Sequence, residues 1–175
     1  MMRPLRADVA IRPYGEGDFE LLARLLGDPA MMVYLGGPES PEKLRARHKR
    51  YLASAPEQGG LYTIEVGPEA NAVGWTGYWE SSWQGVVVWE IGWHVLPEYQ
   101  NQGIATAGVA LALERARERD ASRAVHAFSA VENEASNALC RRLGFTRLEA
   151  VEVEYPAGRM MRSWDWELNL QGERE

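Results

Sequence analysis

The stretch that decides the fold is GVVVWEIGWHVLPEYQNQGIATAG, residues 85–108. An apolar strand covers residues 86–95 and stops at Pro97, and after a short polar loop Gly103 opens a helix of small residues. The first N–H groups of a helix lack intrahelical partners and lie at the positive end of the helix macrodipole. This strand, loop and helix therefore predict an anion-binding site at residues 100–105.

The composition is typical of one soluble domain. A chain of 175 residues, 46% of them hydrophobic, fits the usual size of roughly 100–200 residues for a domain with a real core, so we expect residues 1–175 to form a single domain. Cys140 is the only cysteine and the N-terminus lacks the apolar core of a signal peptide, which favours a cytoplasmic location. No apolar run approaches the roughly 20 residues that span a bilayer, so no membrane partner is expected. The net charge of −6 argues against a nucleic-acid partner, because phosphate backbones require basic patches.

Hydrophobic periodicity and turn residues predict a mixture of strands and helices. The predicted strands cover residues 9–13, 61–66, 72–79, 86–95, 124–130, 145–155 and 160–168. The predicted helices cover residues 19–26, 40–53, 102–119 and 133–143, with a further short element at 30–35. Asp18 and Asn133 are expected N-caps. Antiparallel strands with one strand–helix–strand crossover indicate an α+β (mixed α/β) domain with helices on both faces of the sheet.

Two motifs in register make the chain resemble the GCN5-related N-acetyltransferase (GNAT) superfamily. Residues 100–105, QNQGIA, are similar to the family's acetyl-CoA pyrophosphate loop, Q/R-x-x-G-x-G/A. Residues 133–145, NEASNALCRRLGF, are similar to its N-x-x-S/A…L-G-F helix. The branch that acetylates the N-termini of ribosomal proteins is resembled by three segments together: Ile11-Arg12-Pro13, Asp28-Pro29…Tyr34-Leu35-Gly36 and Glu90-Ile91-Gly92-Trp93. The resemblance covers essentially the whole chain.

The resemblance implies a GNAT fold, with a central, mostly antiparallel, twisted sheet of six or seven strands and a splayed strand pair that holds the cofactor. It implies acetyl-CoA as co-substrate and no metal. The pantetheine arm is expected to pair like an extra strand near Trp93 and Val95, and a bulge is the usual device that splays the strands. A backbone N–H near Val95 is expected to stabilise the oxyanion. Asn133 either contacts the pantetheine or caps its helix.

The pyrophosphate loop is expected to bind through its backbone. Gly103 has no Cβ, so the loop can adopt a positive φ and a phosphate can approach closely. The amides would point inward as an anion-binding nest, which explains why the loop need not be basic. The expected cofactor-binding residues of the loop are Gln100, Asn101, Gln102, Gly103, Ile104 and Ala105.

Acetyl transfer to an amine needs a group that accepts a proton from the amine. Glu90 interrupts an otherwise apolar strand and is the predicted base. Strict alternation places Glu90 on one face with His94, although a bulge would change the parity. Glu152 and Glu154, on a late strand, are rival bases, and His94 is a further candidate.

The departing thiolate must also be stabilised. Cys140 stands where many family members carry a tyrosine, and a mid-helix cysteine is expected to be a packed, unreactive residue. Ser136, one turn earlier on the same helix face, is the preferred thiolate donor, as in the ribosomal-protein branch. Cys140 and water remain alternatives.

The acceptor is left open as a protein N-terminus or a small-molecule amine. Five aromatic residues either line an acceptor pocket or fill the core: Trp75, Tyr78, Trp79, Trp83 and Trp89. The basic helix at residues 40–53 is interpreted as a solvated face. The hydrophobic final strand offers a pairing surface for a homodimer. The alternative function is a non-catalytic acyl-CoA-binding or regulatory module of the same fold.

Overall fold

The computed structural model describes residues 8–172, and the bounds below refer to this part of the chain. The helices are α1 (Phe19–Leu26), α2 (Pro41–Leu52), α3 (Ile104–Asp120) and α4 (Glu134–Arg142), with short 3₁₀ turns at Glu16–Asp18, Pro56–Gln58 and Pro97–Tyr99. The strands are β1 (Val9–Pro13), β2 (Gly59–Val66), β3 (Asn71–Trp83), β4 (Val86–Val95), β5 (Val125–Ala130), β6 (Thr146–Glu154) and β7 (Met160–Leu168). The prediction of a mixed, mostly antiparallel domain is confirmed.

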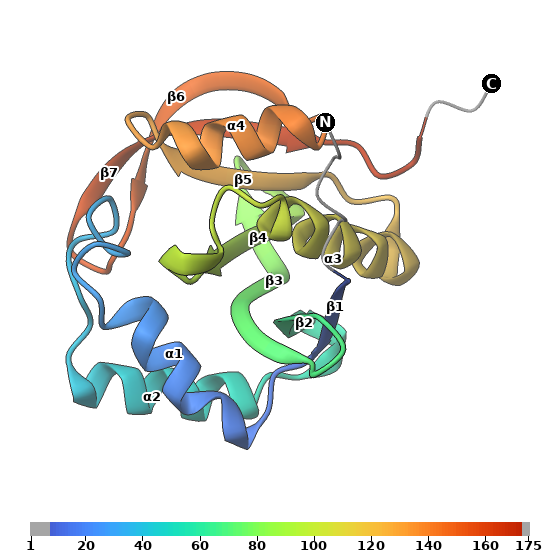
Figure 1. Ribbon diagram of the computed structural model, residues 1–175. Helices are drawn as coiled ribbons and strands as arrows, with labels where there is room; N and C mark the ends of the chain where they lie inside the picture. Colours follow the sequence, from blue (N-terminus) through green and yellow to red (C-terminus); the bar gives the residue numbers. More distant parts are fainter. Residues whose placement is uncertain (1–7, 173–175) are drawn as a thin grey trace, which may run out of the picture.

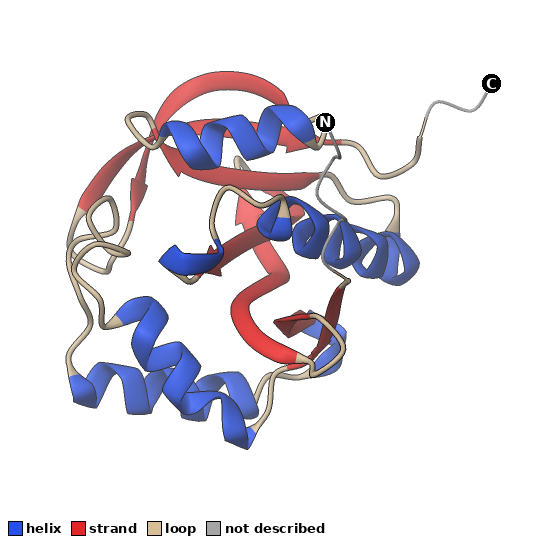
Figure 2. Cartoon of the chain, in the orientation of Figure 1, coloured by secondary structure: helices blue, strands red, loops and turns tan. Residues whose placement is uncertain are grey.

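The strands form one sheet in the order β1-β2-β3-β4-β5-β7-β6, and β4 and β5 are its parallel neighbours. Helices cover both faces, with α1 and α2 grouped apart from α3 and α4 (Figures 1 and 2). Trp89 and Ile91 of β4 belong to the core that also contains residues of α3 and α4. Trp75 of β3 belongs to a second core with α1 and Leu44 of α2. The sheet therefore has an α3/α4 face and an α1/α2 face.

The sheet opens between β4 and β5. These strands pair only at Trp89↔Val125 and Glu90↔His126, and β4 continues to Val95 without a neighbour on that side. The splayed strand pair is as predicted, but the bulge expected as its cause is wrong for β4. Its pairing with β3 keeps one register from Val86 to Val95. The opening therefore arises because β5 diverges, and the alternation of side chains along β4 is unbroken.

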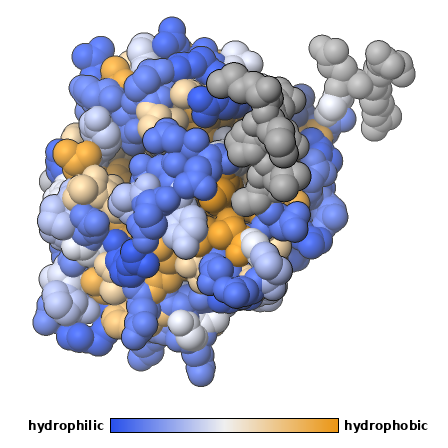
Figure 3. All heavy atoms as spheres, viewed as in Figure 1, coloured by the Kyte–Doolittle hydropathy of each residue, from blue (hydrophilic) through white to orange (hydrophobic). Residues whose placement is uncertain are grey.

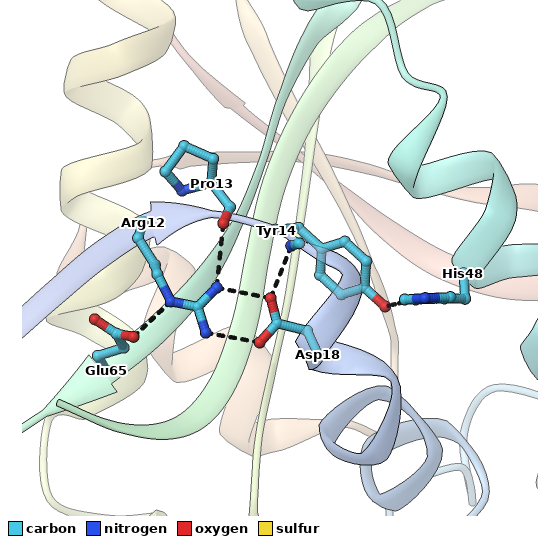
Figure 4. Close-up of polar contacts among 7 residues, drawn as sticks. Arg12, Pro13, Tyr14, Asp18, His48 and Glu65 are labelled. Atoms are coloured by element: carbon cyan, nitrogen blue, oxygen red, sulfur yellow. Dashed lines mark hydrogen bonds and ion pairs between the residues drawn. The ribbon is translucent and has the colours of Figure 1, made fainter.

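Asp18 occupies the N-cap position of α1, as predicted, but its side chain makes no capping hydrogen bond. Its buried carboxylate instead accepts two hydrogen bonds from the guanidinium of Arg12, each 2.7 Å, and one from the N–H of Gly15. The Nε of Arg12 donates to Glu65 of β2 at 2.6 Å (Figure 4). A buried carboxylate requires such a partner, and here the partner joins the start of α1 to the edge of the sheet.

Other boundaries differ from the sequence predictions. Residues 30–35 form turns rather than a helix or strand. β3 continues to Trp83 instead of ending at Trp79, because Ser81 and Ser82 still pair with β4 and the hairpin turns only at residues 84–85.

The final strand is an interior strand of the sheet. β7 pairs with β5 on one side and β6 on the other, so it does not offer the free edge expected for pairing across a homodimer, and the homodimer itself stays a prediction. Both of its hydrogen-bonding edges are already occupied. Among the described helices, none has the length and apolar character required to cross a membrane.

Candidate functional site

One cavity of about 2040 Å³ joins the two faces of the sheet at the opening between β4 and β5. On the face seen in Figure 3, apolar side chains gather near the centre and hydrophilic ones surround them. Every site residue predicted from the sequence lines this cavity: Glu90, Trp93, Val95, Gln100, Asn101, Gln102, Gly103, Ile104, Ala105, Asn133 and Ser136. The structure thus brings them together, while their individual roles stay predictions.

The loop before α3 has an unusual backbone conformation. Gly103 is the N-cap of α3 with φ 78°, and Asn101 also has a positive φ of 59°. An added Cβ at Gly103 would meet no atom within 4 Å. Glycine is therefore favoured by the left-handed backbone and not by crowding, and the space above it is open for a ligand.

The N-terminus of α3 carries amides without acceptors. The first intrahelical bond runs from the N–H of Ala107 to the carbonyl of Gly103 at 3.0 Å. The N–H groups of residues 104–106 find no acceptor within the described chain. Since the macrodipole is positive here, these N–H groups are suited to an anion.

The backbone N–H and the side chain of Gln100 make hydrogen bonds within the protein that the sequence did not predict. Its N–H donates to the carbonyl of Pro97 at 3.2 Å, so the expectation that this amide points inward to the anion is wrong. Its side-chain Nε2 donates to the carbonyl of Val95 at 2.9 Å. Gln100 therefore ties the loop to the end of β4, and the unpaired amides begin after it.

The edge of β4 beyond Glu90 is free. Trp89 donates its N–H towards β5 and Leu96 donates its N–H to Val73 of β3, so the backbone groups of odd-numbered residues of β4 face β5. The N–H and C=O of Trp93 and the N–H of Val95 consequently face the opening between the strands. This is a short hydrogen-bonding edge to which an extended ligand can add.

The start of α4 approaches the same opening. The side chain of Asn133 accepts a hydrogen bond from the N–H of Ser136 at 3.2 Å, so it caps the helix, and both residues line the cavity. Cys140 is fully buried in the core and burial raises the pKa of its thiol to about 12. The Cys140 thiol therefore lies outside the cavity lining, whereas the Ser136 hydroxyl is on a residue that lines it, and the role of Ser136 as thiolate donor stays a prediction.

Glu90 projects from the α1/α2 face of β4. It pairs with Trp79, and Trp79 packs against the core of α1 and α2. Burial raises the pKa of Glu90, and the polar side chains of Ser81 and Trp79 nearby oppose the shift. The rival carboxylates lie on the other face, because Glu152 alternates with Val153 and shares its side of the sheet with Trp164.

His94, the other base candidate, lies on the same face as Glu90. Burial lowers the pKa of His94 to about 4, and the positive charge of Arg47 acts in the same direction. The imidazole lies near Trp75, with ring centroids 6.3 Å apart. His94 is therefore a neutral side chain at pH 7 and a weak base.

Of the five aromatic residues expected either to fill the core or to line an acceptor pocket, some do the first and some the second. Tyr78 and Trp89 are core residues under α3 and are 2% and 1% exposed. The other three, Trp75, Trp79 and Trp83, line the cavity. The sequence alone left these roles undivided because both sets alternate along strands.

The basic helix is not fully solvated as expected. Arg47 of α2 lines the cavity, forms an ion pair with Glu39 and donates to the hydroxyl of Tyr51 at 3.2 Å. Leu44, Arg47 and Tyr51 recur at helical spacing, and this stripe was the signal that placed Arg47 on the inner face.

Comparison with known proteins identifies the architecture. Residues 8–146 match the family model described as an acetyltransferase (GNAT) domain. Spermidine N-acetyltransferase from Vibrio cholerae, in complex with CoA and spermine, superposes with a TM-score of 0.74 at 20% identity, covering 91% of this chain and 94% of that one.

Two ribosomal-protein acetyltransferases are similarly close in structure. The ribosomal-protein-S5-alanine acetyltransferase from Vibrio fischeri has a TM-score of 0.74 at 14% identity, covering 95% and 96% of the two chains. RimL, the ribosomal L7/L12 α-N-protein acetyltransferase, in complex with coenzyme A, has a TM-score of 0.73 at 20% identity, covering 92% and 93%. At these identities the likeness concerns the fold.

Proposed function

This chain belongs to the GNAT acetyltransferase family, and from that premise we propose that it transfers the acetyl group of acetyl-CoA to a primary amine, on a protein N-terminus or a small molecule. The observation that carries the proposal is the single cavity that joins the unpaired amides at the start of α3 to the half-buried Glu90 on the other face of the sheet. Acyl transfer to an amine requires both an anchored donor and a nearby proton acceptor.

The donor half of the cavity fits acetyl-CoA through backbone groups. The N–H groups of residues 101–106 and the positive end of α3 are suited to its pyrophosphate. The free edge of β4 at Trp93 and Val95 is suited to the amides of its pantetheine arm. Neither contact requires a basic side chain, in agreement with the uncharged loop.

The transfer then proceeds directly through a tetrahedral intermediate. Glu90 accepts a proton from the ammonium, directly or through water, and the neutral amine attacks the thioester carbonyl. The N–H of Val95 stabilises the oxyanion, since it faces the opening. The carbon–nitrogen bond forms and the carbon–sulfur bond breaks. The proton that the attacking nitrogen loses passes through the Ser136 hydroxyl to the departing thiolate, which leaves as CoA thiol.

A non-catalytic acyl-CoA-binding module is the second candidate. It is favoured by the burial of Cys140, which stands where many family members have a tyrosine and which is outside the cavity. The two candidates share the donor half and differ in turnover.

Calorimetry and thiol release separate these outcomes. We expect acetyl-CoA to bind and CoA thiol to be released steadily in the presence of a panel of primary amines. Binding without turnover would identify the module, and the absence of acetyl-CoA binding would reject both candidates.

A further inference from the structure

On the α1/α2 face, the cavity has a corner where a carboxylate lies among aromatic rings. Glu90 of β4 is the direct cross-strand partner of Trp79 of β3, and Phe128 of β5 lies on the same face because it alternates with His126, the partner of Glu90. Phe128 contacts Trp83 edge to face, with ring centroids 4.7 Å apart. We name Trp79, Trp83, Glu90 and Phe128, which all line the cavity, the acceptor corner.

The indole of Trp79 is available to a ligand, whereas that of Trp75 is not. Tyr51 stacks on Trp75 with centroids 5.4 Å apart and an angle of 10° between the rings, and Trp75 is 6% exposed. Trp79 is only half-buried, and its ring end lies over Gly92, where an added Cβ would approach to 3.1 Å. Glycine therefore lets the Trp79 ring lie against β4, while the residue still lines the cavity.

The acceptor corner contains one carboxylate that is free to meet a cation. Glu90 is the only acidic residue of β3, β4 and β5 that lines the cavity, and it has no ion-pair partner within residues 8–172. Glu152 and Glu154 of β6 also line the cavity, from the other face of the sheet. Asp165 nearby already accepts from Trp83 Nε1 at 2.9 Å and contacts His126 Nδ1 at 2.7 Å. A single carboxylate is better suited to an acceptor with one ammonium group than to a polyamine with several.

No arginine or lysine belongs to the acceptor corner. Arg47 is held by Glu39, and its side chain is 18% exposed. Arg123, at the far end of β5, is paired with Glu80 at 2.8 Å. Arg50 of α2 and Arg142 of α4 also line the cavity, outside the acceptor corner. The corner itself therefore offers a carboxylate and aromatic rings and no cation.

From this corner, and resting on the proposed function, we propose that the acceptor is a small monoamine whose ammonium group is attached to an aromatic body. The ammonium lies between Glu90 and the indole of Trp79, since a cation is attracted to an aromatic face within about 6 Å. The aromatic body packs against Trp83 and Phe128. Glu90 then takes the proton, and the neutral amine attacks the acetyl carbonyl from this face.

Competing amines test this assignment. We expect kcat/KM for 2-phenylethylamine to exceed that for hexylamine about tenfold, because aromatic pairs and cation–π contacts add discrimination beyond apolar area. Spermidine and a tetrapeptide with a free N-terminus should be poorer still. Efficient turnover that favours spermidine or the tetrapeptide would overturn the inference and leave the proposed function intact.

Two tryptophan variants test whether Trp79 causes the preference for 2-phenylethylamine over hexylamine. Trp79→Leu should bring kcat/KM for 2-phenylethylamine and hexylamine close to equality. Trp164→Leu is the matched control, because Trp164 is also half-buried but lies under Arg147 and outside the cavity lining. If the ratio of kcat/KM for 2-phenylethylamine to that for hexylamine is unchanged in Trp79→Leu, the inference is overturned. Partial loss of folded protein would lower the rate with both amines equally and would not change this ratio.

Direct binding covers the case in which no amine is acetylated. That result would reject the proposed function, and calorimetry of 2-phenylethylamine with the CoA-saturated protein would then decide on the acceptor corner. Binding that is weakened about tenfold by Trp79→Leu supports it. No binding, or binding that is insensitive to Trp79, overturns it.

Discussion

The two halves of the cavity are built from different parts of the chain. The donor half consists of backbone groups in one continuous segment, from the free edge of β4 at Trp93 to the amides that start α3. The acceptor half consists of side chains from several elements, with Tyr51 from α2, Trp79 from β3 and Glu90 from β4. A backbone site depends on local conformation, whereas a side-chain site depends on how distant segments pack. This difference decides what each half reveals in the sequence and how each responds to mutation.

The largest effect is expected from a charge placed in the donor half. Gly103→Glu puts a carboxylate beside the unpaired amides that are proposed to bind the pyrophosphate of acetyl-CoA. The carboxylate and the pyrophosphate are both negative, and like charges at close range cost several kcal/mol. We expect acetyl-CoA affinity to fall about 100-fold or more, measured by calorimetry.

Gly85→Glu is the matched control for that variant. Gly85 also has a positive φ, 79° against 78° at Gly103, and an added Cβ meets nothing within 4 Å at either position. The backbone strain of about 1–2 kcal/mol is therefore common to both. Equal affinities in the two variants would contradict the donor site.

In the acceptor half, Glu90→Gln should lower kcat about 100-fold and leave acetyl-CoA affinity unchanged, because general-base catalysis typically contributes 10²–10⁴-fold. Burial raises the pKa of Glu90, so the wild-type rate should fall as the pH drops through that raised value, and the variant should lack this acidic limb. Initial rates between pH 5 and 9 measure both. Glu152→Gln, on the opposite face, should behave as wild type, and the reverse ranking would exchange the roles of the two carboxylates.

A smaller effect is expected where the halves meet at α4. Ser136→Ala should lower kcat about tenfold through the loss of one hydrogen bond to the departing thiolate. Cys140→Ala should leave kcat unchanged and lower the free energy of unfolding by about 1–2 kcal/mol, because it opens a small cavity in the core. Rates and urea unfolding of both variants check this division, and a fall in kcat for Cys140→Ala alone would contradict it.

The smallest effect concerns the stability of the acceptor half. A carboxyl group whose pKa is raised on folding binds its proton more tightly in the folded chain, so its favourable contribution exists at low pH and is lost as pH rises through the folded pKa. At pH 7, above the ordinary pKa of a glutamate, the half-buried Glu90 therefore destabilises the fold. Glu90→Gln should raise the free energy of unfolding by on the order of 1 kcal/mol at pH 7, in urea titrations. The increase in the free energy of unfolding should be smaller at pH 4. A decrease at pH 7 in Glu90→Gln would contradict a raised pKa of Glu90.

The backbone geometry of the donor half was largely predictable because its determinants are local, while its binding of acetyl-CoA stays a proposal. A positive φ at Gly103 and the unpaired first turn of α3 follow from one glycine between an apolar strand and a helix of small residues. The role of Gln100 was missed because its N–H and side chain bind Pro97 and Val95 through the particular path of the loop. That path is not encoded by residue type.

The acceptor half and parts of the scaffold were less predictable for a tertiary reason. Nothing near Arg12 in the sequence indicates that the Asp18 carboxylate will accept from its guanidinium instead of making a capping hydrogen bond at α1. The position of β7 between β5 and β6 depends on sheet order, which short apolar strands do not specify. Trp79 and Trp89 look alike in the sequence and are separated only by the face of the sheet from which each projects.

Amide hydrogen exchange on addition of acetyl-CoA tests the division of the cavity most directly. The N–H groups of residues 104–106 have no acceptor within the described chain, so they should exchange rapidly in the free protein and slow markedly when the pyrophosphate binds. We predict slowing in residues 101–106 and at Trp93 and Val95, with little change in α2. Slowing in the basic helix α2 and none in residues 101–106 would contradict a donor site made of backbone amides.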